Sequence, residues 1–573
     1  MTPRVRVNQL GYLATGPLRA TLVTNATSPV GWRLERAGEV VARGTSTPRG
    51  HDPSAGLDVH VLDVPAPPPG AGYRLVADGD ASDEFAVGAD LYTPLAQDAL
   101  RFFHLQRSGV EIGPELAGAQ YARPAGHLGV EPNGGDTAVP CLPAGHATTS
   151  DGVDLYDGWT DTHVLDVRGG WYDAGDQGKY VVNGGISVAQ LLAVAERLRR
   201  RGRADEPFAR AVRAEARWEL EWLVRMQVPV GHTYAGMVHH KVVDERWTPL
   251  PTLPHLDPQP RYLHRPSTAA TLNLAAAAAH GARVLASDDP AFAGRLLAAA
   301  RTAYAAAAAT PDLLAPDTNV LANAGGGPYD DTELDDERAW AAAELLLTTG
   351  DPRYADDLRA NPWFVGGPKD PWAVLDWQWT GALALLELAL AEPADVPALP
   401  EHDAVRAAVV EAADRWLAVQ RAQPFGHPYA PPDGRYAWGS NGRLLTNLTV
   451  LAAAADLTGD RAYRDAVAEG MDYVLGRNAL GFSYVTGYGT RFATNQHSRW
   501  YARQLDPTLP PPPPGTVAGG PNSDVPDPVA APLAGRPAQQ CYVDDIGSYG
   551  TNELTINWNA PLVQVAAFLA DPA

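Results

Sequence analysis

The stretch Gly169–Tyr180 combines two carboxylates with glycines and aromatic residues. Asp173 and Asp176 lie three residues apart in it. Glycines let a backbone approach a ligand closely, and the flat faces of Trp171 and Tyr172 are typical of surfaces that bind sugar rings. A carboxylate pair beside aromatic side chains therefore indicates glycoside chemistry. Alternatively, the two aspartates only cap the helix expected to follow, and the local sequence does not separate these interpretations.

A third carboxylate, Glu553, follows the segment 541–552 near the C-terminus. Asn559 and Pro561 predict a helix start shortly afterwards, so we expect Glu553 on a loop just outside a helix. Aromatic neighbours can desolvate such a glutamate, which raises its pKa and keeps it protonated as a general acid. A solvated loop carboxylate is the alternative interpretation.

The segment 483–500 carries His497 and Arg499 two residues apart. In an extended loop both side chains point the same way and can donate hydrogen bonds to hydroxyl groups. A surface position or pairing with a carboxylate is the alternative. Several aromatic residues could form the floor of sugar subsites, although any one of them could instead belong to the core: Trp171, Trp438, Tyr488 and Trp558.

The composition limits the classes of partner. The chain has 67 acidic and 45 basic residues and a formal net charge of -22, which argues against a nucleic-acid partner. No apolar run reaches the ~18 residues that cross a bilayer, so no membrane partner is expected. Cys141 and Cys541 are the only cysteines, and one bridge between them is neither required nor excluded. We expect a monomer.

The N-terminal residues enter a strand pattern without the apolar core of a signal peptide. Two locations therefore stay open. The protein is cytoplasmic if this start is native, and it is secreted if a leader was removed.

The chain changes its hydrophobic period near residue 88. Short β runs separated by proline and glycine fill residues 4–87 and predict a small β-sandwich. From Asp90 onwards the period is helical, so we place the domains at 1–88 and 89–573. A long irregular segment, 109–168, is expected to be a functional loop.

About a dozen helical segments rich in alanine and leucine follow, and strands are nearly absent. Antiparallel helices in this number suit an α/α toroid with functional loops gathered at one end. A pairwise α-solenoid is the alternative, but no fixed-period repeat is visible. The expected helices span about 95–107, 187–202, 206–228, 267–287, 290–309, 336–349, 351–360, 377–391, 402–420, 443–457, 460–475 and 560–570.

Taken together, these motifs resemble glycoside hydrolase family 9. The resemblance is carried by Gly169–Asp176, by the Gly489-x-Arg491 element spaced to His497-x-Arg499, by Tyr549-x-x-Asn552-Glu553, and by Val7–Tyr12, which is similar to the immunoglobulin-like module preceding many of the family's catalytic domains. It implies an all-α (α/α)6-barrel catalytic domain after a small all-β immunoglobulin-like sandwich. One departure is Gln496, where the family usually has proline or an aliphatic residue, a difference expected to affect loop shape more than chemistry.

The resemblance also assigns roles by position. Asp176 matches the family's catalytic base, Asp173 matches the partner that helps to hold the water, and Glu553 matches the general acid. His497 and Arg499 match residues that contact the sugar at the cleavage point. The family implies inverting hydrolysis of β-1,4-glucans, for which acid and base lie about 6.5–9.5 Å apart with water between them. No cofactor is required for this chemistry.

We expect an endo-β-1,4-glucanase acting on cellulose, a related β-glucan or cello-oligosaccharides. The main alternative is an exo-acting glucosidase or glucosaminidase on short β-1,4-oligosaccharides, which would follow if the 109–168 loop blocks one end of the cleft. A non-catalytic carbohydrate-binding protein would require a lost acid or base. All three carboxylates are present, which argues against that class.

Six carboxylates within residues 330–337 suggest a calcium site, since Ca²⁺ prefers hard oxygen ligands. The segment also resembles a Thr/Ser-x-x-x-Asp-Glu sequence that binds calcium in related enzymes. An acid-rich first turn that complements a helix dipole is the alternative. The candidate ligands are Thr332, Glu333, Asp336 and Glu337.

Cys141 with His146 resembles half of a zinc site that some relatives carry in the 109–168 segment. A second cysteine is missing there. Since a structural zinc ion takes four protein ligands, zinc is not expected.

Overall fold

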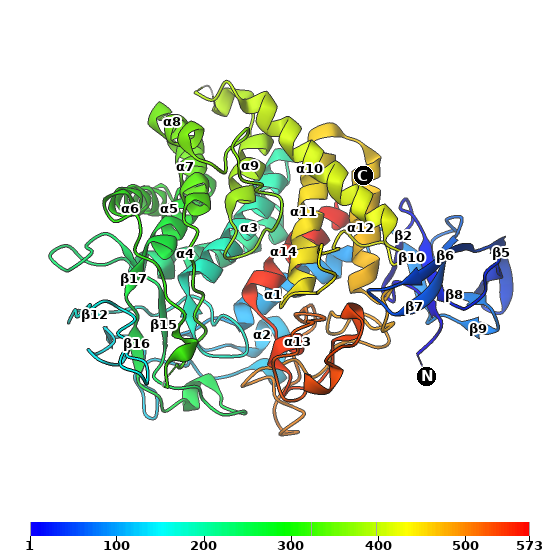
Figure 1. Ribbon diagram of the computed structural model, residues 1–573, viewed down its shortest axis with the longest axis horizontal. Coiled ribbons are helices and arrows are strands. Elements are labelled where there is room, and N and C mark those ends of the chain that lie inside the picture. Colours follow the sequence, from blue (N-terminus) through cyan, green and yellow to red (C-terminus); the bar gives the residue numbers. More distant parts are fainter. Residues whose placement is uncertain (1, 323, 397, 572–573) are drawn as a thin grey trace. The chain divides into compact units, whose positions relative to one another are not determined.

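The computed structural model describes residues 2–322, 324–396 and 398–571, and the chain divides into two compact units (Figure 1). The first unit comprises Met1–Phe102, Val410–His497 and Tyr501–Ala573. The second comprises Phe103–Val409 and Ser498–Trp500. Each unit is described below by itself.

Two sheets form the N-terminal part of the first unit (Figure 1, blue). In one sheet, every neighbouring pair is antiparallel and the order is β1 (Val5–Arg6), β3 (Arg19–Val23), β7 (Leu57–Asp63) and β6 (Thr47–Asp52). In the other, only the pair of β2 and β10 is parallel, and the order is β2 (Gly11–Leu13), β10 (Phe85–Gly88), β8 (Gly70–Ala77), β4 (Gly31–Arg36) and β5 (Glu39–Thr45), with β9 (Asp80–Ala81) on β8.

Alternation of buried and exposed residues builds one core from both sheets. Leu22 and Leu62 come from one sheet, Leu34 and Leu75 from the other, and all four belong to the same buried cluster. This is the packing of a β-sandwich, as the sequence predicts. The last strand of the sandwich, β10, ends at Gly88. The division into compact units does not fall there, so the predicted domain boundary stays a prediction.

Four helices of the second unit pack against α5 (Thr268–Leu285), which is buried almost along its whole length. It contacts α3, α4, α6 and α7, and its many alanines allow this close approach on every side. The helices of this unit are α2 (Pro114–Ala117), α3 (Val181–Arg200), α4 (Pro207–Arg225), α5 (Thr268–Leu285), α6 (Pro290–Ala309), α7 (Asp335–Thr349), α8 (Pro352–Ala360) and α9 (Gly381–Leu390).

Short strands in the second unit support the loops between these helices. They form three small sheets: β13 (Lys179–Tyr180), β15 (Lys241–Asp244) and β16 (Arg261–Leu263); β14 (Val238–His239) and β17 (Pro266–Ser267); β11 (Val139–Pro140) and β12 (Val164–Leu165). The first sheet matters most for the site, because β13 directly follows the loop that carries the two aspartates.

In the first unit, α11 (Ser440–Thr458) packs on α12 (Arg461–Val474) and on α14 (Ile556–Ala570), and the short α13 (Tyr549–Asn552) precedes α14. The helices α1 (Tyr92–Leu105) and α10 (His402–Ala422) contribute residues to both units. Among the described residues, no helix is long and apolar enough to span a membrane.

Two helix caps considered from the sequence are not observed. Helix α3 begins at Val181, directly after β13, and no aspartate side chain caps it. Helix α14 begins at Ile556, so Asn559 lies inside it rather than capping it. The Asn559 side chain donates to the carbonyl of Ala99 (2.9 Å) and accepts from the N–H of Val517 (3.0 Å). These contacts with distant segments override its preference for a cap.

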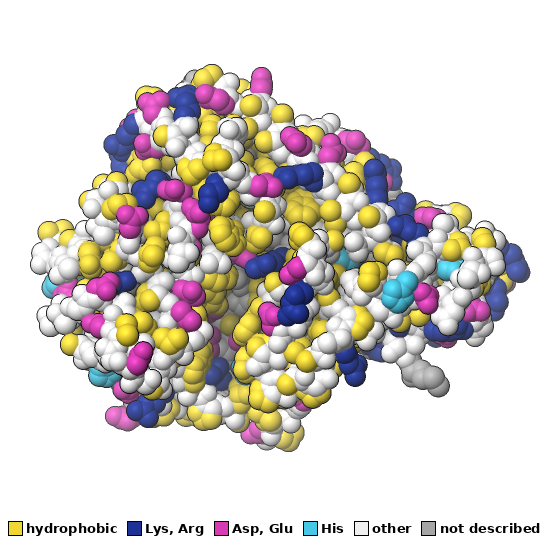
Figure 2. Space-filling view, viewed as in Figure 1, with side chains coloured by type: hydrophobic (Ala, Val, Ile, Leu, Met, Phe, Trp, Pro, Cys, Tyr) yellow, Lys and Arg dark blue, Asp and Glu magenta, His cyan; other side chains and the backbone are white. Residues whose placement is uncertain are grey.

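Charged side chains are mixed over the face shown in Figure 2. Lys and Arg side chains lie scattered among Asp, Glu and apolar side chains there. The described residues of this face therefore form no continuous basic surface of the kind that follows a phosphate backbone.

Candidate functional site

The two predicted aspartates lie on the loop 169–178 of the second unit. The buried Nζ of Lys179 donates to the carbonyls of Val167 (2.7 Å) and Gly169 (2.8 Å), which ties the end of this loop to its start. Gly170 has a φ of 72°, and a Cβ there would lie 2.6 Å from a tryptophan ring. Only glycine fits at this position, and the loop is held rigidly.

Asp173 and Asp176 differ in how their oxygens are used. Asp173 is buried and accepts from the Asn183 amide on Oδ1 (2.8 Å) and from the Tyr329 hydroxyl on Oδ2 (2.6 Å). Within the described chain, the hydrogen bonds to Asp176 all reach Oδ2, from the Tyr180 hydroxyl (2.8 Å) and from a backbone N–H (3.2 Å). Asp173 is therefore held through both oxygens, whereas Asp176 keeps Oδ1 outside these bonds.

Tyr329 is a site residue that the sequence patterns did not indicate. It follows the run 325–328, which consists of three glycines and a proline. The Nζ of Lys241 donates to the Gly327 carbonyl (2.6 Å), and the Gly327 N–H donates to the Tyr180 hydroxyl (2.8 Å). Burial lowers the pKa of Lys241 to about 7. The glycine run is the sequence feature that could have indicated Tyr329, because glycines let a backbone approach other groups closely, here the Tyr180 hydroxyl that donates to Asp176.

Trp171 and Tyr172, predicted as sugar platforms, are 1% and 0% exposed. The Trp171 ring packs against Phe103 at 4.7 Å. The Tyr172 hydroxyl lies 2.6 Å from Nδ1 of His127, and its ring lies 5.6 Å from that of Trp500. Packing covers the apolar faces of both residues, so this structure corrects their role from sugar platforms to supports of the loop.

Arg499 lies in the second unit and braces the aspartate loop. Its backbone N–H and its Nη1 each donate to the carbonyl of Gly175 at 3.0 Å, between the two aspartates. Its Nε donates to the Thr248 hydroxyl at 2.8 Å. The guanidinium also lies 5.4 Å from the centre of the Trp247 ring, which is 46% exposed. Trp247 is thus an exposed aromatic beside the loop that the sequence patterns did not single out.

Glu553 and His497 lie side by side in the first unit. Glu553 is half-buried and directly follows α13, on a loop as predicted. The His497 N–H donates to the Asn552 carbonyl, and the Gly519 N–H donates to the Glu553 carbonyl, both at 2.9 Å. The His497 Nδ1 donates to the Ile546 carbonyl at 2.7 Å, which fixes the orientation of the imidazole. The predicted acid and one predicted sugar contact are therefore neighbours.

An exposed aromatic pair lies beside them. The Tyr549 ring is 6.0 Å from the rings of both Trp438 and His497. Trp438 is 43% exposed and Tyr549 is 37% exposed. This pair offers apolar faces next to the predicted acid, as sugar binding requires.

Tyr488 and Trp558, predicted as floors of sugar subsites, pack against other parts of the first unit. Tyr488 is buried, and its hydroxyl donates to Asp98 Oδ2 at 2.8 Å, so it joins two segments of the first unit. Trp558 is half-buried with its ring against the glycine backbone at residues 439, 442 and 519. Tyr488 therefore presents no face to a sugar, while Trp558 packs against Gly439, the residue that follows Trp438 in the sequence.

Asp331, Asp336 and Glu337 form a buried carboxylate cluster at the start of α7. Burial is the largest cause that raises the pKa of Asp331 to about 7 and that of Asp336 to about 6. Burial and the charges of both aspartates raise the pKa of Glu337 well above its usual range. Four of their oxygens have no hydrogen-bond partner within the described residues: Oδ2 of Asp331, Oδ1 of Asp336 and both oxygens of Glu337. Oxygen donors of this kind suit a hard cation such as calcium, and protons shared between Glu337 and the two aspartates are the alternative.

The two other predicted calcium ligands do not join this cluster through their side chains. Glu333 pairs with Lys369 at 2.8 Å, and Thr332 is exposed. The buried cluster therefore contains Asp331 and not the predicted Glu333, whose side chain pairs with Lys369.

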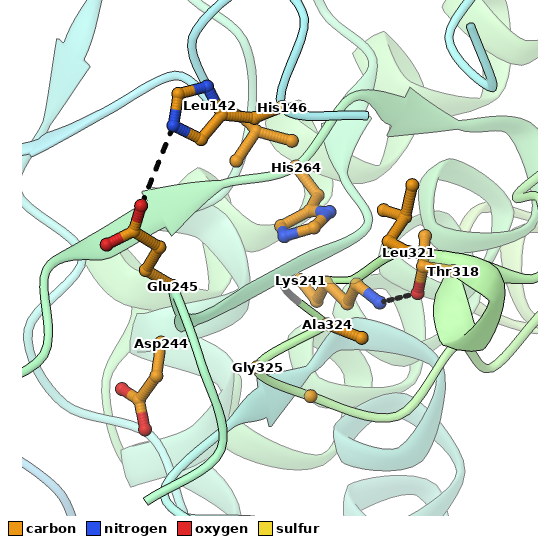
Figure 3. A pocket seen from close by; sticks show the side chains of 11 residues that line it. Leu142, His146, Lys241, Asp244, Glu245, His264, Thr318, Leu321, Ala324 and Gly325 are labelled. Atoms are coloured by element: carbon orange, nitrogen blue, oxygen red, sulfur yellow. Dashed lines mark hydrogen bonds and ion pairs between the residues drawn. The ribbon is translucent and has the colours of Figure 1, made fainter. Parts of the chain in front are cut away.

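Cys141 and His146 do not come together. His146 Nε2 instead lies 3.7 Å from Glu245 Oε1. A dashed line marks this pair in Figure 3. The Cys141 Sγ lies 3.6 Å from Nε2 of His163, which lies 2.8 Å from Nε2 of His239. This group of three could hold a metal ion, but it has one ligand fewer than a structural zinc site.

The pocket in Figure 3 is too small for a glucan chain. Its cavity volume is about 10 Å³, roughly the space of one water molecule, and far below the roughly 300–1,000 Å³ of ligand sites. Lys241 lies at this pocket and its Nζ donates to the Thr318 hydroxyl at 2.8 Å. Because Lys241 also donates to the Gly327 carbonyl, the pocket lies among residues that hold the segment before Tyr329.

Comparison with known proteins gives two family matches. The profile of glycosyl hydrolase family 9 matches residues 92–566, and that of the cellulase N-terminal ig-like domain matches residues 1–82. Both matches confirm the resemblance drawn from the motifs.

Among curated proteins, Endoglucanase C of Cellulomonas fimi is 53% identical over 99% of this chain. The chain spans about half of that relative, 52% of its length. A cellulose 1,4-beta-cellobiosidase of Acetivibrio thermocellus is 42% identical over 99% of this chain and 67% of its own.

Among solved structures, a thermostable endoglucanase of Alicyclobacillus acidocaldarius matches with a TM-score of 0.82 and 31% identity, covering 99% of both chains. A Zn-binding triple mutant of the family 9 endoglucanase J30 matches with the same TM-score and 30% identity, covering 98% of this chain and 99% of its own. These structures confirm the predicted fold class, a helical catalytic domain preceded by a β domain.

Proposed function

This chain belongs to glycosyl hydrolase family 9, and on that premise we propose that it is an endo-β-1,4-glucanase that hydrolyses cellulose, related β-glucans or cello-oligosaccharides with inversion. The observation that carries the proposal is the unequal pair of aspartates. Asp173 is held through both oxygens, while Asp176 keeps Oδ1 for a water molecule. One fixed carboxylate and one available carboxylate suit a base with an orienting partner.

In the proposed reaction, Oδ1 of Asp176 removes a proton from water as the water oxygen attacks the anomeric carbon. Asp173, fixed by Asn183 and Tyr329, accepts the second hydrogen of that water and orients it. Glu553 gives its proton to the glycosidic oxygen, and the bond from the anomeric carbon to that oxygen breaks. The products are a new reducing end of inverted configuration and a free hydroxyl. A monomer suffices for these steps.

Substrate contacts are proposed for the residues around these carboxylates. Trp438 and Tyr549 offer exposed aromatic faces beside Glu553, and His497 lies next to its backbone. Arg499 braces the aspartate loop and lies against the exposed Trp247. We propose that these side chains bind the sugars flanking the cleaved bond.

An exo-acting enzyme is the second candidate, favoured by the cellobiosidase among the similar proteins. Product analysis separates the two. An endo-acting enzyme lowers the viscosity of carboxymethylcellulose early and releases mixed cello-oligosaccharides. Release of one short product with unchanged viscosity would indicate exo action, and cleavage of chito-oligosaccharides alone would indicate a glucosaminidase.

Calcium is proposed at the Asp331–Asp336–Glu337 cluster, where it would offset the charge of buried carboxylates without taking part in the chemistry. Chelation is therefore expected to lower the melting temperature, because an ion that binds only the folded state stabilises it by mass action. Differential scanning calorimetry with and without chelator measures the loss, and added Ca²⁺ should restore it.

The matched control is Asp335→Asn, since Asp335 is 49% exposed and outside the cluster. It should respond to chelator as the wild type does, whereas Asp336→Asn should respond less. A melting temperature indifferent to chelator and to Ca²⁺, in protein shown to be free of calcium, would contradict the site.

A further inference from the structure

Helix α4 carries two buried carboxylates, one turn apart, that both reach Trp171. Oε2 of Glu219 accepts the Trp171 backbone N–H at 2.9 Å. Oε2 of Glu215 accepts the indole Nε1–H of the same residue at 3.4 Å. Trp171 stands two residues before Asp173. Glu219 thus holds the backbone of Trp171, and Glu215 holds its side chain.

The two carboxylates have different surroundings. Glu215 receives Arg107 through both oxygens, at 2.7 and 3.2 Å, so its charge is balanced. Glu219 is 1% exposed and makes no ion pair within the described part of the chain, where its Oε1 also lacks a hydrogen-bond partner. It fits against α3 at Gly184, where any Cβ would collide with that oxygen. The fold therefore leaves space for the Glu219 carboxyl group but, within the described residues, gives it no positively charged partner in an ion pair.

The groups facing Glu219 favour its neutral form. Burial, the largest effect, raises the pKa of Glu219 to about 8, and the charges of Asp173 and Glu215 act in the same direction. The Trp171 N–H and the charge of Lys179 act against it without reversing the shift. At neutral pH the group is an uncharged acid, which accepts the N–H without adding negative charge beside Asp173.

We propose that Glu219 is a positioning residue, which fixes Trp171 through its backbone N–H and thereby holds the loop of Asp173 and Asp176 in its working geometry. It does not contact the substrate. This inference rests on the proposed roles of the two aspartates, and it adds to them a support that acts through the loop backbone.

The test compares Glu219→Gln with Glu219→Ala on an activated aryl β-cellobioside. Such a substrate needs little protonation, so titration of Glu553 does not obscure the alkaline side of the pH profile. The glutamine amide can still accept the Trp171 N–H and cannot ionise. We expect Glu219→Gln to keep kcat within about twofold at pH 7 and to retain activity at least one pH unit further into alkali than the wild type.

Glu219→Ala removes the hydrogen bond. We expect its kcat to fall about tenfold or more with KM within about twofold, because a misplaced catalytic loop weakens the transition state more than it weakens ground-state binding. Glu221→Gln, which alters a half-exposed carboxylate on the same helix, is the matched control and should behave as the wild type. A circular dichroism spectrum checks that each variant is folded.

Stability against pH gives a readout independent of activity. The folded-state pKa of Glu219 lies above the usual value of 4.5, so the stability it contributes is complete below about pH 4.5 and is lost as pH rises towards 8. The melting temperature of Glu219→Gln relative to wild type should therefore rise between pH 5 and pH 8. This readout applies even if the alanine variant fails to fold.

Two results would overturn the inference: an unchanged alkaline limb in Glu219→Gln with a constant difference in melting temperature, or a wild-type kcat in folded Glu219→Ala. Failure of the proposed function looks different. In that case Asp176→Ala itself would keep its activity, whatever the Glu219 variants do.

Discussion

Replacing Asp176 by alanine is expected to lower kcat on β-1,4-glucans by about 10²–10⁴-fold, the usual range for a lost general base. Oδ1 of Asp176 is the carboxylate oxygen of the loop that the internal hydrogen bonds of the described chain leave for water. The variant should stay folded: the Tyr180 hydroxyl loses Asp176 as the acceptor of its proton and still accepts the Gly327 N–H. Steady-state kinetics on cello-oligosaccharides measures the loss.

Two comparisons make this result specific. Asp173→Ala should lose less activity than Asp176→Ala, because orienting a water contributes less than accepting its proton. Asp157→Ala, whose side chain is 90% exposed, should be unaffected. Azide should restore some turnover to Asp176→Ala and give an α-glycosyl azide from a β-linked substrate. If Asp173→Ala proves far more damaging than Asp176→Ala, the two roles must be exchanged.

Replacing Glu553 by glutamine should affect substrates according to their leaving groups. Hydrolysis of cello-oligosaccharides should fall by about 10²–10⁴-fold, because the glycosidic oxygen needs a proton to leave. Aryl glycosides with acidic phenols should lose much less, since those groups leave as anions. Comparing kcat/KM over a series of aryl β-cellobiosides measures the difference.

Glu411→Gln is the control in the same unit, because Glu411 is exposed on α10 and removed from any proposed role. Equal losses of Glu553→Gln on good and poor leaving groups would argue against the acid role. Activity close to wild type on cello-oligosaccharides would end it.

The local sequence was sufficient to predict helices and loops whose ends are determined by neighbouring residues. The alanine- and leucine-rich periodicity predicted α6 at the bounds observed, 290–309, because nothing at its ends competes with Asp289 as cap and Pro290 in the first turn. The irregular backbone of 169–178 was also predictable, since its glycines favour a loop, but the local sequence did not decide whether its aspartates form a site or cap a helix. Glu553 was correctly expected on a loop before a helix.

Contacts between distant segments could not be predicted from one sequence. Tyr329 reaches Asp173 from 156 positions away, and no periodicity encodes that hydrogen bond. The burial of Trp171 depends on α4, so a tryptophan beside carboxylates was equally consistent with a sugar platform. The acidic cluster contains Asp331 and not Glu333, whose side chain pairs with Lys369, and that lysine is 36 residues distant.

The stereochemistry of the first product tests the central claim most directly. If Asp176 activates water on the face opposite Glu553, each β-linkage must yield the α-anomer first, since the water displaces the leaving group in one step. Proton NMR of early products, recorded before mutarotation, distinguishes the anomers. We predict the α-anomer first, with the β-anomer appearing later by mutarotation. A β-anomer formed first would mean a covalent glycosyl-enzyme intermediate and would contradict the assignment of Asp176 as base.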